Sequence, residues 1–267
     1  MHYTPKQFTG SWAIVLGGSS GFGLAVIEKL VMHGMNIAVL YRETSTVERV
    51  LKSKFTQLAA NNEVIIAPFN LNALNESGRN LFIQKVEHLI SKHTVKLLLH
   101  SIARGNLKPL IKNDDGGSLS NVDIELTTYA MGTSILDWAK LLLNQNLFAA
   151  DARIIGLTSE GSHRYWQGYA AVSIAKASLE SLNTYMAVEL AKFGLKTNLI
   201  QAGVTDTPSL RRIPGSEELL STIAQRNPMG RMTTPIDVAN VIYLLCTPEA
   251  AWINGSLIHV DGGEHCR

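Results

Sequence analysis

The chain has 267 residues, 46% of them hydrophobic, and its 24 basic and 22 acidic side chains give a formal net charge of +2. This hydrophobic content is ample for the buried core of one large domain, so a single domain over residues 1–267 is expected. The balanced charge, with no basic run interleaved with aromatic residues, argues against a nucleic-acid groove and a membrane-binding face. A small-molecule ligand fits this composition better.

Targeting signals and metal-ligand spacings are not found in the sequence. No apolar run reaches the ~18 residues of a membrane span, and the stretch from Met1 to Lys6 has no apolar signal core. Cys246 and Cys266 have neither CxxC spacing nor a metal-like spacing with histidine, which indicates a reducing compartment and no structural metal. We therefore expect a soluble, cytoplasmic protein without a metal site.

Short apolar runs typical of β-strands alternate with helical patterns along the chain. These runs are apolar nearly throughout, as in a parallel sheet with helices on both faces. The sequence thus predicts an α/β fold, a doubly wound Rossmann domain with a seven-stranded parallel sheet that binds ligands at the carboxyl ends of its strands. The predicted strands are Trp12–Leu16, Ile37–Tyr41, Val64–Phe69, Val95–His100, Ala152–Thr158, Leu195–Gln201 and Ser256–Asp261.

Apolar residues at helical spacing predict the connecting helices. Leu24, Ile27 and Val31 recur at i, i+3 and i+7, and Gly34 follows where a helix C-cap is wanted. The segment Thr234-Pro235-Ile-Asp237 predicts an N-cap, a proline in the first turn and an acidic first turn. Two further helices are predicted from one-sided apolar patterns, Val47, Val50, Leu51, Phe55 and Leu58 in the first and Leu81, Phe82, Val86, Leu89 and Ile90 in the second.

Two connections are long for a compact domain. Ile102–Asn121 contains Asp114-Asp-Gly-Gly117, and Ala202–Ser216 contains Pro208 and Pro214. Long loops inside compact domains are often functional lids. We predict that the second, together with the helix that follows it to residue 230, covers the substrate.

A glycine-rich turn, Gly17-Gly-Ser-Ser-Gly21-Phe-Gly23, joins the first predicted strand to the first predicted helix. Glycines let the backbone approach a pyrophosphate, and the helix N-terminus presents free N–H groups and a partial positive charge to it. A glycine triplet alone is weak evidence, but the strand-turn-helix context predicts a dinucleotide site. The hydroxyls of Ser19 and Ser20 are additional phosphate donors.

The end of the second predicted strand indicates which dinucleotide is bound. An acidic residue there would bind the adenosine ribose of NAD, whereas this strand ends Leu40-Tyr41-Arg42. Because a guanidinium pairs with a 2′-phosphate, Arg42 favours NADPH. The alternative is that Arg42 is a solvated surface charge and Glu43 contacts the ribose, which would suit NADH.

The segment Tyr169-Ala-Ala-Val-Ser-Ile-Ala-Lys176 carries a candidate acid pair. Seven residues make almost two helical turns, so Tyr169 and Lys176 share a face if the helix includes position 169. A phenol with a pKa near 10 is a poor proton donor at neutral pH, and a nearby ammonium favours its ionised form. Such pairs are also common in cores and at interfaces, so spacing alone leaves a structural role open.

At this point the sequence resembles the short-chain dehydrogenase/reductase family over nearly the whole chain. Ala202-Gly-Val-Thr-Asp-Thr207 resembles the family's nicotinamide loop, and Val260-Asp-Gly-Gly263 its C-terminal signature. His100-Ser-Ile-Ala103 stands where ordinary members carry Asn-Asn-Ala-Gly. The resemblance implies cofactor contacts by Gly17, Ser19, Ser20, Gly21, Phe22, Gly23, Arg42, Asn70, Leu71, Ser101, Ile102, Ala103, Thr158, Lys176, Gly203, Val204, Thr205 and Thr207.

The position of the tyrosine departs from the ordinary family pattern. Ordinary ketoreductases of the family carry it four residues before the lysine, where this chain has Val172, and a serine thirteen residues before the tyrosine, which survives as Ser159. The Tyr-x6-Lys spacing, with Lys176-Ala-Ser-Leu-Glu180, is similar to the divergent branch of NADPH-dependent enoyl-acyl carrier protein reductases. That branch often has a second tyrosine at the place of Ser159, so this chain departs from it there.

The resemblance implies hydride transfer to the β-carbon of a trans-2-enoyl thioester, with Tyr169 donating a hydrogen bond to the enolate oxygen and Lys176 holding the nicotinamide ribose. Because the charge develops two carbons from its position in ketone reduction, the donor must move as well. A three-residue shift on a helix is about 4.5 Å along its axis, which is comparable to the separation between the charged oxygen positions in the two reactions. Ser159 and Tyr165 are secondary candidates for substrate contact, and His163 is interpreted as a loop residue rather than a base.

Two other functions stay open on the sequence. The first is a carbonyl reductase acting on a 3-oxoacyl group or small ketone, and the second is a catalytically silent dinucleotide-binding sensor. The expected partner is an acyl thioester on acyl carrier protein or coenzyme A. Apolar helical faces in Asp123–Leu147 and Ser173–Lys192, together with the resemblance, predict a homotetramer or homodimer.

Overall fold

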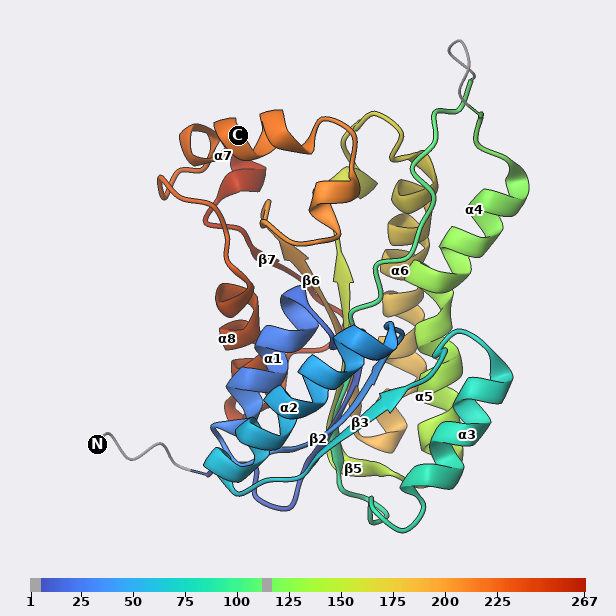
Figure 1. Cartoon of the computed structure of the whole chain (residues 1–267), viewed down its shortest axis with the longest axis vertical. Helices are drawn as coiled ribbons and strands as arrows, with labels where there is room; N and C mark the ends of the chain where they lie inside the picture. Colours follow the sequence, from blue (N-terminus) through green and yellow to red (C-terminus); the bar gives the residue numbers. More distant parts are fainter. Residues whose placement is uncertain (1–5, 112–116) are drawn as a thin grey trace.

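The computed structural model describes residues 6–111 and 117–267. Their strands form one sheet in the order β3-β2-β1-β4-β5-β6-β7, with every neighbouring pair parallel (Figure 1). This confirms the predicted doubly wound α/β fold. The strands are β1 (Trp12–Leu16), β2 (Asn36–Tyr41), β3 (Ile66–Asn70), β4 (Val95–His100), β5 (Phe148–Thr158), β6 (Leu195–Ala202) and β7 (Leu257–Val260).

The sheet changes direction of winding at β1, which pairs with β2 on one side and with β4 on the other. The last residue of β1, Leu16, is in register with Leu40 of β2 and His100 of β4. The chain therefore leaves all three strands at the same level. In open α/β sheets this crevice at the carboxyl ends is where ligands bind.

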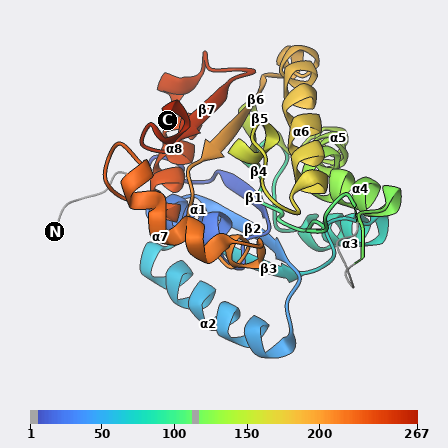
Figure 2. The same ribbon diagram turned by 90° about the horizontal axis from the view of Figure 1, so that it is seen from above.

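Helices cover both faces of the sheet (Figures 1 and 2). One layer holds α1, α2 and α8, and the other holds α3 to α6. Each layer buries its own apolar core against the strands, so β1 contributes Val15 to one core and Ile14 to the other. The helices are α1 (Gly21–Val31), α2 (Ser45–Asn62), α3 (Glu76–Val86), α4 (Asn121–Thr128), α5 (Ser134–Asn144), α6 (Ala170–Glu189), α7 (Ser216–Arg226) and α8 (Pro235–Cys246).

The structure confirms the predicted glycine after α1 and the predicted capping residues of α8. Gly34 follows α1 with a φ of +83°. Thr234 caps α8, with Pro235 in the first turn, and exchanges hydrogen bonds with Asp237 in a capping box. The apolar face predicted for α2 is only partly right, because Leu51 and Phe55 are buried while Val50 is exposed.

The apolar stretch Asp123–Leu147 is not one continuous helix. A π-helical turn, Tyr129–Thr133, separates α4 from α5, and the N–H of Ser134 bonds to the carbonyl of Tyr129 five residues earlier. A Cβ at Gly132 would lie 2.6 Å from the carbonyl oxygen of Ala175 on α6. The π turn thus brings this backbone close to the middle of α6.

The two long connections lie at the carboxyl end of the sheet. Residues 112–116 of the first, including Asp114 and Asp115, lie outside the described residues. The second contains a 3-10 turn, Leu210–Arg212, and leads into α7, which lies above the strand ends (Figure 1). In the described part of the chain, no helix is long and apolar enough to cross a membrane. Cys246 is buried in α8 and Cys266 is exposed, and both are free thiols.

Candidate active site

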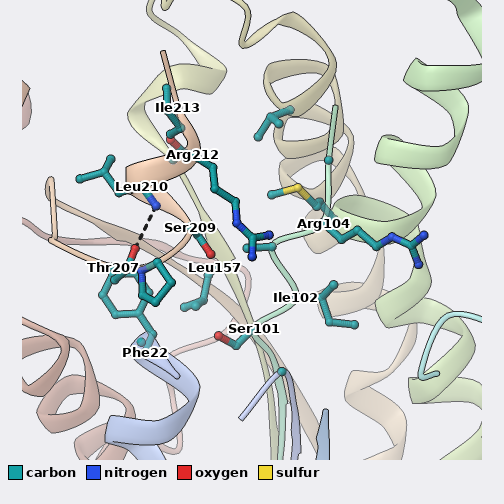
Figure 3. Close-up of a pocket in the computed structure, with 18 of the residues that line it drawn as sticks. Phe22, Ser101, Ile102, Arg104, Leu157, Thr207, Ser209, Leu210, Arg212 and Ile213 are labelled. Atoms are coloured by element: carbon teal, nitrogen blue, oxygen red, sulfur yellow. Dashed lines mark hydrogen bonds between the residues drawn. The ribbon is translucent and has the colours of Figure 1, made fainter. Parts of the chain in front are cut away.

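A cavity of about 710 Å³ opens at the carboxyl ends of the strands, and Figure 3 shows part of its lining. Its walls come from segments far apart in the sequence: the glycine turn before α1, the ends of β2, β4 and β5, the start of α6, and residues 202–216 with Leu219 of α7. The topology therefore brings the predicted motifs to one place. The second long connection and the start of α7 line this cavity, as a covering segment would.

The glycine turn forms a tight cradle that fits a pyrophosphate. A Cβ at Gly17 would lie 2.4 Å from the Ser101 carbonyl oxygen, and one at Gly23 would lie 2.2 Å from that of Gly17. Ser20, the N-cap of α1, makes no side-chain capping bond, so the first N–H groups of α1 keep their capacity for an anion. Gly17, Ser19, Ser20, Gly21 and Phe22 line the cavity, whereas Gly23 supports the turn from behind.

Arg42 and Glu43 both line the far end of the cavity, beyond the glycine turn. Asn70 is not a lining residue, but its side chain accepts from the Glu43 main-chain N–H at 3.1 Å and donates to the Glu43 carbonyl at 2.9 Å. It therefore fixes the loop that carries both charged residues. Leu71 lines the cavity beside them. This end suits the adenosine half of a dinucleotide.

The segment after β6 forms a wall of the cavity next to the glycine turn, where a Cβ at Gly21 would meet Thr207 Cγ2 at 3.5 Å. Thr207 is buried, and its Oγ1 accepts from the Leu210 N–H at 3.2 Å. The N–H of Val204 donates to the buried carboxylate of Glu264, at 3.2 Å from Oε2. Burial raises the pKa of Glu264. Thr205 closes the loop by donating to the Gly203 carbonyl at 2.9 Å.

Tyr169 lies at the N-cap of α6, immediately before the first helical residue, and lines the cavity. Its hydroxyl donates to Ser159 Oγ at 3.2 Å. Burial raises the pKa of the phenol, with the Ser159 hydrogen bond acting in the opposite direction. The expected lowering by the Lys176 ammonium is not seen in this structure, so the phenol is a protonated hydrogen-bond donor.

Lys176 is buried and its ammonium is held by main-chain oxygens. Nζ donates to the Leu157 carbonyl at 2.7 Å and to the Met131 carbonyl, in the π turn, at 3.2 Å. Desolvation lowers its pKa to about 8, although the nearby Glu180 carboxylate opposes this. The ammonium form therefore still predominates at neutral pH.

His100, at the end of β4, is a buried neutral imidazole. Its Nε2 lies 2.8 Å from Ser134 Oγ, and Nδ1 has no hydrogen-bond partner within the described residues. Desolvation lowers its pKa to about 3, and the charge of Lys176 acts in the same direction. The histidine supports the cavity floor and does not line it.

Glu180, one turn after Lys176, ties α6 to the end of β5. Its Oε1 accepts from Thr158 at 2.5 Å and from Ser162 at 2.8 Å, and its Oε2 lies 2.8 Å from His163 Nε2. His163 is 62% exposed, as a loop residue would be. Thr158 lines the cavity, but its hydroxyl already donates a hydrogen bond to Glu180.

A family model described as enoyl-(acyl carrier protein) reductase matches residues 17–265. The chain belongs to this family of short-chain dehydrogenase/reductases. Members of the family are oxidoreductases that bind NAD(P)H. The turn before α1 fits that cofactor, since its glycines leave room for a pyrophosphate and the α1 N-terminus is uncapped.

Similar proteins within the family carry out more than one reaction. The 3-oxoacyl-[acyl-carrier-protein] reductase FabG of Escherichia coli K12 is 25% identical over 97% of this chain and 99% of that protein. The peroxisomal 2,4-dienoyl-CoA reductase SPS19 of Saccharomyces cerevisiae is 27% identical over 98% of this chain and 86% of that protein. The FabI structure from Candidatus Liberibacter asiaticus superposes with a TM-score of 0.84 at 20% identity, covering 98% of each chain. This last likeness shows the fold.

Compared with the ordinary family pattern, the tyrosine stands three residues earlier in the sequence, just before α6. Val172 occupies the ordinary tyrosine position, and it is buried and lines the cavity together with Tyr169, Lys176 and Ser159. Tyr165, a secondary candidate, is 89% exposed and does not line the cavity. Several lining residues were not among the predicted site residues, among them Met131, Arg212 and Glu264.

Proposed function

We propose that this chain catalyses NADPH-dependent reduction of the C=C bond of a trans-2-enoyl thioester carried by acyl carrier protein or coenzyme A. The observation that carries the proposal is the pairing of Tyr169 and Val172 in the cavity wall. The phenol of Tyr169 comes three residues before the position where ordinary members carry their tyrosine. That position is occupied here by the apolar side chain of Val172. A donor displaced from the helix to the residue just before it suits charge that develops away from the carbon accepting hydride.

The chain's residues would act on the substrate oxygen. When bound, the dinucleotide supplies the hydride. Tyr169, protonated and buried, would turn its hydrogen bond from Ser159 Oγ to the enolate oxygen, and a proton delivered to the α-carbon through water would complete the saturation. Lys176 would hold the nicotinamide ribose and add positive charge, because two carbonyls fix its ammonium below the cavity. Met131, Leu107, Trp166, Ile213 and Leu219 supply apolar surface for an acyl chain.

NADPH is favoured over NADH because the exposed guanidinium of Arg42 lines the adenosine end of the cavity. The Glu43 carboxylate lines the same end and is the feature that would favour NADH. The 2′-phosphate would gain a charge-assisted bond from Arg42 if the guanidinium turns inward.

A carbonyl reductase is the second candidate, and the Tyr169–Ser159 hydrogen bond of 3.2 Å favours it. A hydroxyl pair can hold a ketone oxygen as well as an enolate. Relatives of similar identity include a 3-oxoacyl reductase. A silent dinucleotide-binding sensor is disfavoured by the intact Tyr169 and Lys176.

The experiment compares NADPH oxidation with crotonyl-CoA and acetoacetyl-CoA, in the wild type, Tyr169→Phe and Tyr165→Phe. We expect turnover of crotonyl-CoA, a loss of kcat by 10²-fold or more in Tyr169→Phe, and near wild-type rates in Tyr165→Phe, whose ring lies in solvent. Turnover of acetoacetyl-CoA alone would replace the proposed reaction with carbonyl reduction. Full activity of Tyr169→Phe would remove the phenol from the mechanism.

We further propose that the chain is one catalytic domain, acts in the cytoplasm, and assembles as a homotetramer or homodimer. Support for assembly comes from large apolar side chains on outer helical surfaces. Val122 and Leu126 of α4 are 61% and 60% exposed, and Tyr185 and Val188 of α6 are 64% and 74% exposed. These residues extend the apolar faces expected from the sequence.

A further inference from the structure

Two adjacent arginines on the covering segment have different environments. Both side chains are exposed, but Arg211 forms a double hydrogen bond with Asp206, at 2.7 Å from each carboxylate oxygen. Arg212 lines the cavity, and its guanidinium points inward above Leu157 and Ser101 (Figure 3). The main-chain N–H of Arg212 donates to the Ser209 carbonyl at 3.3 Å, but no hydrogen bond or ion pair within residues 6–111 and 117–267 engages the guanidinium. A guanidinium presented in this way is available to an anionic ligand.

The base of the covering segment rests on the glycine turn. A Cβ at Gly21 would meet Thr207 Cγ2 at 3.5 Å. From Thr207 the chain makes a short 3-10 turn, pinned because the Leu210 N–H donates to Thr207 Oγ1 and the Arg211 N–H to the Thr207 carbonyl, at 3.2 and 3.1 Å. Arg212 ends this turn. Its position is therefore set relative to the same backbone that would hold a pyrophosphate.

The middle of the cavity otherwise has no free cation among the described lining residues. The glycine turn contains no basic side chain. Arg42 lies at the adenosine end, Lys176 is bonded to two carbonyls, and Arg104 extends away from Phe22 and the α1 side (Figure 3). The pyrophosphate of a dinucleotide would bring two negative charges there. Without Arg212, only main-chain N–H groups would stabilise them.

We propose that Arg212 binds the pyrophosphate of the dinucleotide and so links cofactor binding to the placement of the covering segment over the substrate. The inference rests on the proposed function only in requiring a nicotinamide dinucleotide. Arg212 binds phosphate as a planar fork, to which a lysine is an incomplete substitute. Arg211, already paired with Asp206, has no such role.

The experiment measures dissociation constants by calorimetry for NADP⁺, NAD⁺ and adenosine 2′-monophosphate, without any acyl substrate. Arg212→Gln should weaken both dinucleotides by a similar factor of about 10 or more, because one charge-assisted bond pair is lost. It should leave adenosine 2′-monophosphate, which lacks the pyrophosphate, unchanged. Arg212→Lys should recover part of the loss, and high salt should narrow the gap between wild type and Arg212→Gln.

Arg211→Gln is the matched control and should stay within about two-fold of wild type for all three ligands, because its charge is already paired with Asp206. Arg42→Gln should weaken NADP⁺ and adenosine 2′-monophosphate while sparing NAD⁺. The proposal is overturned if Arg212→Gln and Arg211→Gln bind both dinucleotides equally well.

A second outcome also overturns it. If Arg212→Gln leaves dinucleotide affinity intact but raises KM for a coenzyme A thioester and not for the matching N-acetylcysteamine thioester, Arg212 binds the phosphates of the acyl carrier. Because the calorimetric dissociation constants are measured without turnover, a wrong assignment of the reduced bond leaves that part of the test valid. Melting temperatures of each variant show whether the fold is retained.

Discussion

At the scale of single residues, the protonation of Lys176 is expected to make activity depend on pH. Burial lowers its pKa from the ordinary 10.5 to about 8. The active ammonium is therefore lost as pH rises through about 8, and kcat/KM, which reports the free enzyme, should fall above that value. A kcat/KM profile recorded from pH 6 to 10 with the preferred thioester tests this, and a flat profile to pH 9.5 would contradict it.

The same proton has the opposite effect on stability. Between about pH 8 and 10.5 the unfolded chain keeps the lysine proton that the folded chain has released. Since the unfolded state then binds more protons, the contribution of this site to the free energy of unfolding increases with pH across that interval. Urea unfolding of the wild type and Lys176→Met should be compared at pH 7 and 10. The free energy of unfolding of the wild type should rise with pH relative to that of the variant.

Residue roles were predictable where a motif fixes the backbone and unpredictable where tertiary contacts decide. The glycine turn and Lys176 line the cavity as their motifs indicate. Tyr165 was a candidate for substrate contact, but its ring is 89% exposed: α6 starts only at Ala170, and Gly168 has a φ of +70°, so no helix relates Tyr165 to Tyr169. The carbonyl of Met131 and the side chain of Glu264 carry no sequence signal for the site, because each acts through a neighbour distant in sequence.

At the scale of elements, Gly132 sets the spacing between the π turn and α6. Replacing it with alanine would push a methyl group against the Ala175 carbonyl, 2.6 Å away, and displace the Met131 carbonyl from Lys176. We expect Gly132→Ala to lose about 1–3 kcal/mol of unfolding free energy and to lower kcat. Denaturant titration and steady-state kinetics measure both.

Gly117→Ala is the control for this change, since a Cβ there would have no atom within 4 Å. It should match wild type in both measurements. Equal behaviour of the two variants would mean that the π turn can move without consequence for the lysine.

The π turn also marks the limit of element prediction. Strand and helix types follow from apolar patterns, and the seven predicted strands all exist, with β3 starting at Ile66 and β5 reaching back to Phe148. A π turn needs an extra residue accommodated by packing, here against Ala175, and the 3.6-residue pattern of Asp123–Leu147 does not reveal it. The pattern predicted apolar helical faces there, and the structure divides the stretch into α4, the π turn and α5.

At the scale of the whole molecule, a buried cation far from the cavity stabilises the amino end of the sheet. Arg153 is fully buried in β5, and its guanidinium donates to Asp151, to the Leu245 carbonyl at 2.6 Å and to the Thr247 carbonyl at 3.3 Å. Arg153→Met removes the donor to the two carbonyls, while Asp151 keeps its bonds to Lys96 and Lys196, and should cost about 1–3 kcal/mol of unfolding free energy. Because Arg153 lies five residues before Thr158 along β5, kinetics below the melting transition should be unchanged.

Lys196, which also bonds to Asp151 but is 20% exposed, provides the comparison. Lys196→Met should cost less, because water can replace its contact with the carboxylate. If both variants melt together, or if Arg153→Met alters KM, the amino end of the sheet is not an independent stabilising cluster.

The two thiols give this chain a built-in attachment point for a spectroscopic probe. Cys246 is buried in α8, and burial raises the pKa of its thiol to about 12, so alkylating reagents should not react with it. Cys266 is open to solvent and stands two residues after Glu264, which lines the cavity. A maleimide dye would therefore attach to the unmutated protein at one site beside the cavity, where its emission can follow dinucleotide titrations in real time.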